Sequence, residues 1–440
     1  MNLYDYQQAF GAWDKTGSEM RRAIRRWFRL YYGKVDEPGL DPCQRIAYTV
    51  VSKLQRSVFA EYLPRAETPF AQKLLRELET VQREAMQLAL VGGECYIKPC
   101  PAQQGFTFYL LPRDSVLIFA RDASGVPTDI GSIERSTLGN CYYTLLERRQ
   151  VDEKGFLTIE NKLFRSLNSD SLGQQAQLSE HPDYARLPEK YTYEQPIYSV
   201  GLARLHTPMV NCVDGSREPV SVYAAAEGLI RNIDRNEALL CGEFERGQSR
   251  IIASKDLLNG DKGLTDNLFV GLDHDQEELG LHIFSPALRE QSYLARKQEY
   301  LRNIESVIGL KRGVLSDSNL EERTATEIAS SMGEHNLTVM DFQAMWEACI
   351  NETVQLCARL AQLYGIDAQL LQPRIRVDWG NGVLFDEEKT WADYKQMVAA
   401  GLLAPEVALG WRFNMPSETQ QQRAAIRQRY MPEERKQNGA

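Results

Sequence analysis

The spacing of apolar residues between positions 287 and 364 predicts two long helices joined by a short loop. The first helix follows Ser285 and Pro286, an N-cap with proline at the first helical position, and ends near Gly309. The second carries apolar residues at alternating intervals of three and four, which is the spacing of one buried helix face. Those residues are Phe342, Trp346, Cys349, Thr353, Cys357, Leu360 and Tyr364. At ~1.5 Å per residue, roughly forty residues form a rod on the order of 60 Å long, unless Gly333 breaks it.

The loop between these helices is rich in glycine and charge. Residues 311–323, KRGVLSDSNLEER, place a basic pair and a glycine before a polar run. The helix restarts at one of two overlapping capping boxes, Ser318 with Glu321 or Thr324 with Glu327. Both starts lead into the same second helix.

The first half of the chain predicts helices followed by strands. Residues 15–34, 42–58 and 68–91 have the apolar spacing of helices, and the last of these segments ends at Gly92 and Gly93. From there to about residue 210, short apolar runs alternate with turn residues, as in β-structure. Within this region we expect the polar stretch NSDSLGQQAQLSEHPDYARLPEKY to be an exposed excursion.

A third long helix is expected from Pro219, in its first turn, to about Glu245. Like the helix after Pro286, it carries abundant charge and no thick apolar stripe. The insert between these two helices has the strand candidates SRIIAS and LHIFS on either side of an acidic loop at residues 273–278. This order predicts a stalk of two antiparallel helices with a small module at its end.

The end of the chain predicts one strand and three short helices. The strand is RIRVDWGNG, and the helices span residues 386–400, 405–410 and 417–430. The last helix starts at a capping box formed by Ser417 and Gln420.

The segment at 15–34 is a basic amphipathic helix. Its arginines share one face, opposite apolar residues; they are Arg21, Arg22, Arg25, Arg26 and Arg29. Two interpretations are open. The arginines pair with acids of a neighbouring chain on a surface helix, or they contact nucleic acid or a membrane.

Composition narrows the class of protein. A chain of 440 residues predicts two or three domains of ~100 to 200 residues each. With 25% charged and 43% hydrophobic residues, and no apolar run near the ~20 needed to span a bilayer, we expect a soluble protein that does not enter the membrane. The N-terminal MNLYDYQQAFGAWDK has no signal-peptide core, and eight cysteines without a CxxC pair indicate reduced cytosolic thiols. A net charge of -9 argues against a surface that grips nucleic acid by charge.

The common catalytic and metal-binding signatures are missing. No P-loop, HExxH, GxSxG or dinucleotide fingerprint is present, and the five histidines are far apart in sequence. The DHDQEE loop fails as an EF-hand because the sixth position from Asp273 is Glu278 and the twelfth is Phe284. Cys95 and Cys100 lack a second ligand pair for zinc. We therefore expect no enzyme, no cofactor and no metal.

The order of these features resembles the portal proteins of tailed bacteriophages, particularly those of siphophages of Gram-positive hosts. The resemblance covers roughly residues 40 to 430. It is carried by LALVGGECYIKP, IDRNEALLCGEFERGQSRII, FSPALREQSYLARKQEYLRNIESVIGL, the GLKRGVLS to RTATEI passage, and RIRVDWGNGVLFDEE.

The resemblance implies an α+β portal fold with seven regions. They are an N-terminal arm and β-rich wing (1–215), a first stem helix (216–246), a small α/β clip (247–285), a second stem helix (286–310), a tunnel loop (311–323), a long helix with a closing wing strand (324–385), and a helical crown and tail (386–440). The implied tunnel-loop residues are Lys311, Arg312, Gly313, Ser316, Asp317, Asn319 and Arg323. The implied docking residues of the clip are Asp273, Asp275, Glu277 and Glu278.

The resemblance also implies partners and a location. The chain would form a dodecameric ring at one capsid vertex of the virion, after assembly in the host cytoplasm. Terminase large subunit, a head-completion or adaptor protein, and the major capsid and scaffold proteins would contact it, and double-stranded DNA would pass through without sequence specificity. Two alternatives remain from the residues alone: a magnesium-dependent nuclease using Asp273, Asp275 and Glu278, or another unrecognised enzyme, and a cellular scaffold protein.

Overall fold

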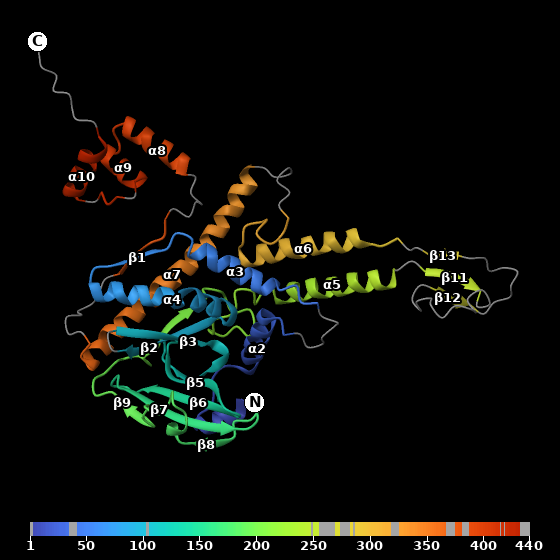
Figure 1. Ribbon diagram of the computed structural model, residues 1–440, viewed down its shortest axis with the longest axis horizontal. Coiled ribbons are helices and arrows are strands. Elements are labelled where there is room, and N and C mark those ends of the chain that lie inside the picture. Colours follow the sequence, from blue (N-terminus) through green and yellow to red (C-terminus); the bar gives the residue numbers. More distant parts are fainter. Residues whose placement is uncertain are drawn as a thin grey trace, which may run out of the picture. The chain divides into compact units, whose positions relative to one another are not determined.

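Helices and strands are both abundant, so the expected α+β class is confirmed (Figure 1). The chain divides into two compact units, Met1–Trp379 and Gly380–Ala440. The computed structural model describes residues 3–34, 42–102, 105–247, 250–254, 269–272, 282–284, 287–317, 325–366, 375–380, 387–413, 415–417 and 419–431.

The helices predicted before residue 92 are confirmed, and a short one precedes them. The four are α1 (Leu3–Phe10), α2 (Ser18–Tyr32), α3 (Ile46–Val58) and α4 (Pro69–Gly92). Thr68 caps α4 by accepting a hydrogen bond from the Ala71 backbone N–H, with proline at the first helical position. Helices α2, α3 and α4 bury their apolar faces in the largest core. Helix α1 packs against the six-stranded sheet that is described in the next paragraph.

The β-rich region forms two antiparallel sheets. In the three-stranded sheet the order is β10-β2-β3, and in the six-stranded sheet it is β4-β5-β6-β7-β8, with β9 also paired to β7. The strands are β2 (Glu94–Ala102), β3 (Gly105–Pro112), β4 (Val116–Arg121), β5 (Pro127–Leu138), β6 (Cys141–Val151), β7 (Leu157–Ser166), β8 (Gln174–Ala176), β9 (Lys190–Thr192) and β10 (Ala203–His206). Because β8 and β9 lie in the stretch expected to be an excursion, that polar segment adds edge strands to the sheet.

A two-stranded sheet ties distant parts of the first unit together. Strand β1 (Leu63–Ala66), which the apolar pattern did not predict, pairs with the predicted strand β14 (Ile375–Asp378). The two strands are more than three hundred positions apart, so their pairing closes the unit around the core.

The prediction that Pro219 opens a helix is wrong. Helix α5 spans Glu227–Arg246, and the residues before it cross the end of α4. The backbone N–H of Val222 donates to the Leu90 carbonyl at 2.9 Å, and the Val220 carbonyl accepts from the Thr207 hydroxyl at 2.7 Å. These tertiary bonds use backbone groups that a helix would need for itself.

Helix α6 (Glu290–Ile308) returns beside α5, and Figure 1 shows the two helices running side by side away from the sheets. Between them in the chain lie β11 (Arg250–Ser254), β12 (Phe269–Leu272) and β13 (His282–Phe284). Strand β11 pairs parallel with β12 and antiparallel with β13, so the predicted insert does contain a small sheet. Helix α6 starts later than expected, and Ser285 and Pro286 lie outside the described residues.

Helix α7 (Ala325–Tyr364) is a continuous helix of 40 residues, and Gly333 does not break it. Of the predicted apolar seam, the first six residues are buried in the core, from Phe342 through Leu360. Tyr364 is the exception, because its side chain is 48% exposed and its hydroxyl lies 3.0 Å from the Tyr193 hydroxyl. Both capping boxes fall at least partly outside the described residues.

The second unit contains the three predicted short helices, α8 (Glu387–Ala399), α9 (Pro405–Arg412) and α10 (Gln420–Tyr430). The predicted cap of α10 is wrong by two residues. Thr419 and Gln422 form the capping box, since the Thr419 hydroxyl accepts from the Gln422 N–H and the Gln422 side chain accepts from the Thr419 N–H. Ile426 and Ala408 are buried where α9 and α10 meet.

A buried ionic cluster joins the two large sheets. Glu94, at the start of β2, is fully buried, with one carboxylate oxygen 2.8 Å from Arg113 Nε and the other accepting a bond of 2.7 Å from Arg204. Arg121 lies 3.8 Å away and is also held by Glu218. Burial alone would raise the pKa of Glu94, but the three guanidinium groups more than offset it and lower that pKa to about 2.

We expect Glu94→Gln to destabilise the first unit by about 3–5 kcal/mol, because it leaves buried arginines without their counter-charge. Since the folded pKa lies below the ordinary 4.5, the carboxylate's contribution is present above that pH and is lost as the pH falls towards about 2. Urea unfolding at several pH values measures both effects. The control Glu299→Gln, at an exposed glutamate of α6 that pairs with Arg302, should change stability by less than about 0.5 kcal/mol, and an equal loss in both variants would contradict the assignment.

We expect Gly333→Ala to stabilise the protein by about 0.5–1 kcal/mol, because Gly333 is a helical, solvent-exposed residue and glycine is entropically costly there. An added Cβ would meet no atom within 4 Å. Chemical denaturation of the two proteins measures the difference. A loss of stability would mean that the helix requires glycine at this position.

Candidate functional site

The loop after α6 begins at a glycine that ends the helix. Gly309 adopts a left-handed conformation with φ 78°, and its N–H and that of Leu310 donate to carbonyls of the last helical turn. The side chain of Thr338, on α7, lies directly over Gly309 and occupies the space that a Cβ would need. The chain therefore leaves α6 at one defined point and in one direction.

The next residues form a tight turn. The Lys311 carbonyl accepts a hydrogen bond from the Val314 N–H at 3.2 Å, with Arg312 and Gly313 at the two central positions. Gly313 has φ 90°, a conformation that favours glycine. The predicted basic pair thus occupies the start and first corner of a closed turn.

Glu305, a residue of α6, holds the far side of this turn. Its Oε1 accepts hydrogen bonds from the backbone N–H groups of Gly313 at 3.1 Å, Leu315 at 2.5 Å and Ser316 at 2.8 Å. Its Oε2 accepts from the Ser316 hydroxyl at 2.7 Å. The carboxylate is fully buried, so these four bonds form out of contact with water.

Two further side chains fasten the same segment. Lys53, on α3, donates to the Val314 carbonyl, and Gln298, on α6, accepts from the Asp317 N–H at 2.9 Å. His335, on α7, lies near the loop, where burial and the charge of Lys311 lower the pKa of its imidazole. The first half of the predicted tunnel loop is therefore hydrogen-bonded to α3 and α6, and it lies near α7.

The predicted site residues differ in how they lie. Arg312, Gly313 and Asp317 are exposed and Lys311 is half-buried, whereas Ser316 is buried against Glu305. Asn319 and Arg323 lie outside the described residues. The same holds for the four acidic residues of the predicted docking loop, Asp273, Asp275, Glu277 and Glu278, and hence for the acids of the nuclease alternative.

Sequence reasoning missed Glu305, although a signal existed. The buried residues of α6 are Leu301, Ile304, Glu305 and Ile308, which share one helix face. An acid on the apolar face of a helix requires a hydrogen-bonding partner, and here that partner is the following loop.

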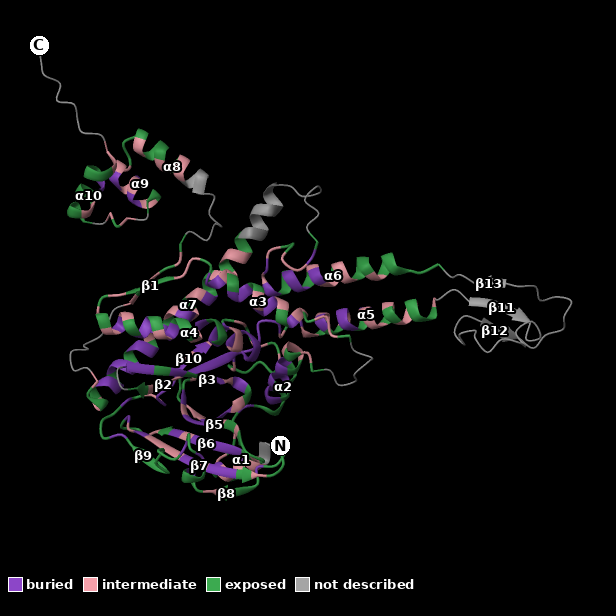
Figure 2. Cartoon of the chain, viewed as in Figure 1, coloured by how far each residue is buried: buried purple, intermediate pink, exposed green. Residues whose placement is uncertain are grey.

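The outer parts of α5 and α6 form a second candidate surface. Buried residues of α5 lie between Ile230 and Asn236, and those of α6 between Leu301 and Ile308. Over residues 237–246 and 290–300 no residue is buried, as Figure 2 shows. Leu239, Phe244 and Leu294 are 44–52% exposed there. Among the described residues, the outer part of this hairpin therefore exposes apolar side chains on both helices.

Polar contacts link the two helices of the hairpin. Asn236 donates to the Tyr293 carbonyl at 3.0 Å, Arg289 pairs with Glu243 at 2.8 Å, and Lys297 pairs with Glu237 at 3.1 Å. The three contacts join the same two helices and so fix how α5 and α6 are aligned.

Two of the arginines of α2 have partners within the chain. Arg21 is buried and bonds to Asp14 and to the Val116 carbonyl, and Arg26 pairs with Glu227 at 2.9 Å. For these two residues, internal structure and not an outside ligand accounts for the charge.

A serine, a histidine and an aspartate meet on the six-stranded sheet, but not as a catalytic triad. Ser136 Oγ lies 3.2 Å from His181 Nε2, and His181 Nδ1 accepts the backbone N–H of Asp183 at 3.3 Å. Because Nδ1 accepts, the imidazole proton is on Nε2 and points at the serine. A general base needs the opposite tautomer, so this arrangement does not activate Ser136.

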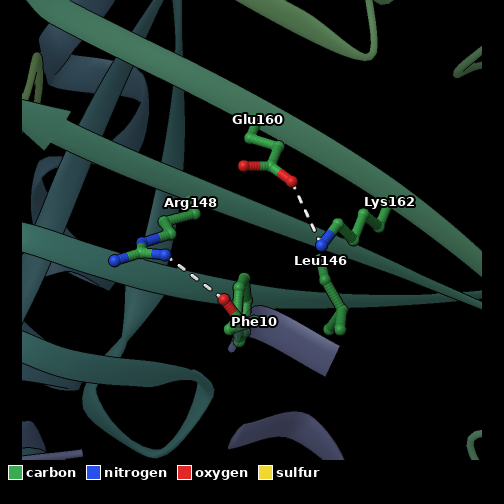
Figure 3. Close-up of a pocket in the computed structure, with 5 residues that line it drawn as sticks. All are labelled: Phe10, Leu146, Arg148, Glu160 and Lys162. Carbon is green, nitrogen blue, oxygen red and sulfur yellow. Dashed lines mark hydrogen bonds and ion pairs between the residues drawn. The ribbon is translucent and has the colours of Figure 1, made fainter. Parts of the chain in front are cut away.

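The pocket shown in Figure 3 is a packing seam and not a ligand site. Arg148 donates to the Phe10 carbonyl at 3.2 Å, and Lys162 pairs with Glu160 at 3.1 Å and donates to the Ala9 carbonyl. Leu146 completes the lining. The polar groups thus fasten α1 to the sheet.

The described ranges contain no group of three or more His, Cys, Asp or Glu side chains that could hold a metal ion. No helix in these ranges has the length and apolar character required to cross a membrane.

We expect Gly309→Ala to destabilise the loop and α6 by about 1–3 kcal/mol, since alanine is strained at this φ and its Cβ would collide with Thr338. Adding Thr338→Ala should restore the stability lost to the collision with the Thr338 side chain. It should not restore the stability lost to backbone strain at residue 309. Urea unfolding of both single variants and the double variant separates the two terms. Purely additive losses would show that Thr338 does not restrict this position.

Comparison with known proteins does not identify the chain: no protein-family model matches this sequence, and no curated protein matches it.

Proposed function

We propose that this chain is a portal protein of a tailed bacteriophage, one subunit of a ring through which double-stranded DNA is packaged and ejected. In this proposal the β-rich part of the first unit is the wing, α5 and α6 are the stem, and β11–β13 belong to the clip. The loop at 311–323 is the tunnel loop, and the second unit is the crown. Terminase and a head-completion protein dock on the ring, which contacts major capsid and scaffold proteins at one vertex of the virion.

The observation that carries the proposal is the uncovered α5–α6 hairpin. Helices in proteins gain most of their stability from packing an apolar face, and the outer part of this two-helix hairpin, where no residue is buried, has little such packing. Leu239, Phe244 and Leu294 remain largely exposed in the single chain. Neighbouring copies in a ring supply the missing contacts.

A ring of identical subunits joined head to tail requires two different surfaces on each chain. The hairpin exposes apolar side chains on both of its helices, Leu239 and Phe244 on α5 and Leu294 on α6. We place α5 of one copy against α6 of the next. Interfaces of obligate assemblies usually bury more than ~2,000 Å², so further parts of the first unit would take part.

The charge of the chain supports a conduit that does not hold DNA tightly. The net charge is -9, while the described half of the loop exposes Arg312 next to Lys311 and, five residues after Arg312, Asp317. A few cations allow brief contacts with phosphate, whereas a continuous basic wall would release many counterions and hold the duplex.

We expect the purified protein to form closed rings of about twelve subunits, because the hairpin needs neighbours on both sides. Native mass spectrometry and electron-microscope class averages measure the number. A protein that stays monomeric over a wide concentration range would overturn the proposal.

We expect Leu239→Glu and Leu294→Glu each to reduce ring formation by about tenfold or more, since each introduces a charge into one side of the α5–α6 contact. Mixing the two variants should yield pairs but no rings, because only one of the two contacts of each chain is intact. Native mass spectrometry distinguishes these species.

The matched control is Leu167→Glu, at a side chain that is 80% exposed on the turn after β7. It makes the same chemical change away from the hairpin and should leave rings intact. Rings of normal yield from both hairpin variants would show that α5 and α6 do not form the subunit contact.

A further inference from the structure

We infer that Glu305 is the positioning residue of the loop after α6: its carboxylate fixes the turn that presents Lys311 and Arg312. That these two cations face a polyanion rests on the proposed function, whereas the positioning itself does not. The inference adds a residue from the helix to a site that the sequence assigned to the loop alone.

The first step is the position of the basic pair between two anchors. On one side, the left-handed Gly309 ends α6 and its N–H and that of Leu310 return to the helix. On the other side, Glu305 Oε1 accepts the N–H groups of Gly313 and Ser316. Lys311 and Arg312 lie in the few residues between these anchors, so their backbone has little freedom.

The second step is the nature of the far anchor. Three backbone N–H groups and one hydroxyl converge on a single fully buried carboxylate. No ion pair within the described ranges involves Glu305, so the loop itself supplies the partners of its charge. A buried carboxylate that loses these bonds costs free energy. The loop conformation that supplies the bonds is therefore favoured as long as the carboxylate is buried.

Further bonds hold the rest of the described loop. Beyond the Glu305 bonds, the Asp317 N–H donates to Gln298, and the Val314 carbonyl accepts from Lys53. Residues 311–317 are thus bonded at both ends and in the middle. The geometry therefore fixes the backbone that carries Lys311 and Arg312.

The test uses the full-length protein without DNA. Glu305→Gln keeps the shape and removes the charge, Glu305→Ala removes the acceptors, and Ser316→Ala removes one of the four bonds. The matched control is Glu299→Gln, an exposed glutamate on the same helix whose carboxylate lies 3.8 Å from Arg302. Hydrogen exchange at residues 313, 315 and 316 and tryptic cleavage after Lys311 and Arg312 are measured.

In Glu305→Gln we expect exchange at these three amides to accelerate by about tenfold or more, a factor that corresponds to about 1.4 kcal/mol. Cleavage after Lys311 and Arg312 should accelerate in parallel. Glu305→Ala should show a larger effect, Ser316→Ala a smaller one and Glu299→Gln none. The amides of α4 should be unchanged in all variants.

Two results would overturn the inference. One is unchanged exchange in both Glu305 variants. The other is an equal acceleration in α4, which would make Glu305 a residue of general stability without a specific hold on the loop. Neither measurement needs a ring or DNA, so both remain valid if the proposed function fails.

A packaging assay then tests the link to function. Under the proposed function, rings of Glu305→Gln should retain packaged DNA less well than rings of Glu299→Gln. Normal retention together with accelerated local exchange would leave Glu305 as the positioning residue and count against a DNA contact by the basic pair.

Discussion

The burial of Glu94 is the constraint on which the arrangement of the first unit depends. A carboxylate with no exposure to water needs charged partners, and it takes them from three other places in the chain: Arg113 after β3, Arg121 in β4 and Arg204 in β10. The cluster therefore sets how the three-stranded sheet, the six-stranded sheet and the segment with Glu218 meet. Just before it, Gly93 has φ 87° and lies against the Pro219 backbone, which leaves no room for a side chain.

This well-packed body contrasts with the hairpin that leaves it. Helices α5 and α6 are buried only at the ends that enter the core, near Ile233 and Ile304. Farther out they contact each other through polar groups and expose apolar side chains. Apolar side chains exposed on both helices favour a partner that covers them. The proposed ring provides that partner from identical chains.

The loop between α6 and α7 lies at the junction of these two parts. Its glycines permit the sharp change of direction, but glycines alone would leave it free to move. Glu305 removes that freedom by drawing three N–H groups of the loop onto one carboxylate. A basic pair on a fixed turn can contact a moving polyanion repeatedly at the same place, which suits the proposed conduit.

The sequence by itself determined the elements whose signals are local. Apolar spacing located α4 and α7, and it located the seam from Phe342 to Leu360, because helical periodicity is a property of neighbouring residues. It also identified Gly309 and Gly313 as the points where the loop turns. It failed at Pro219, at β1 and at Glu305, where bonds to distant segments decide the outcome. Only the tertiary structure brings Leu90 to Val222, β14 to β1, and a buried carboxylate to three loop amides, since the backbone satisfies its hydrogen bonds wherever the folded chain offers partners.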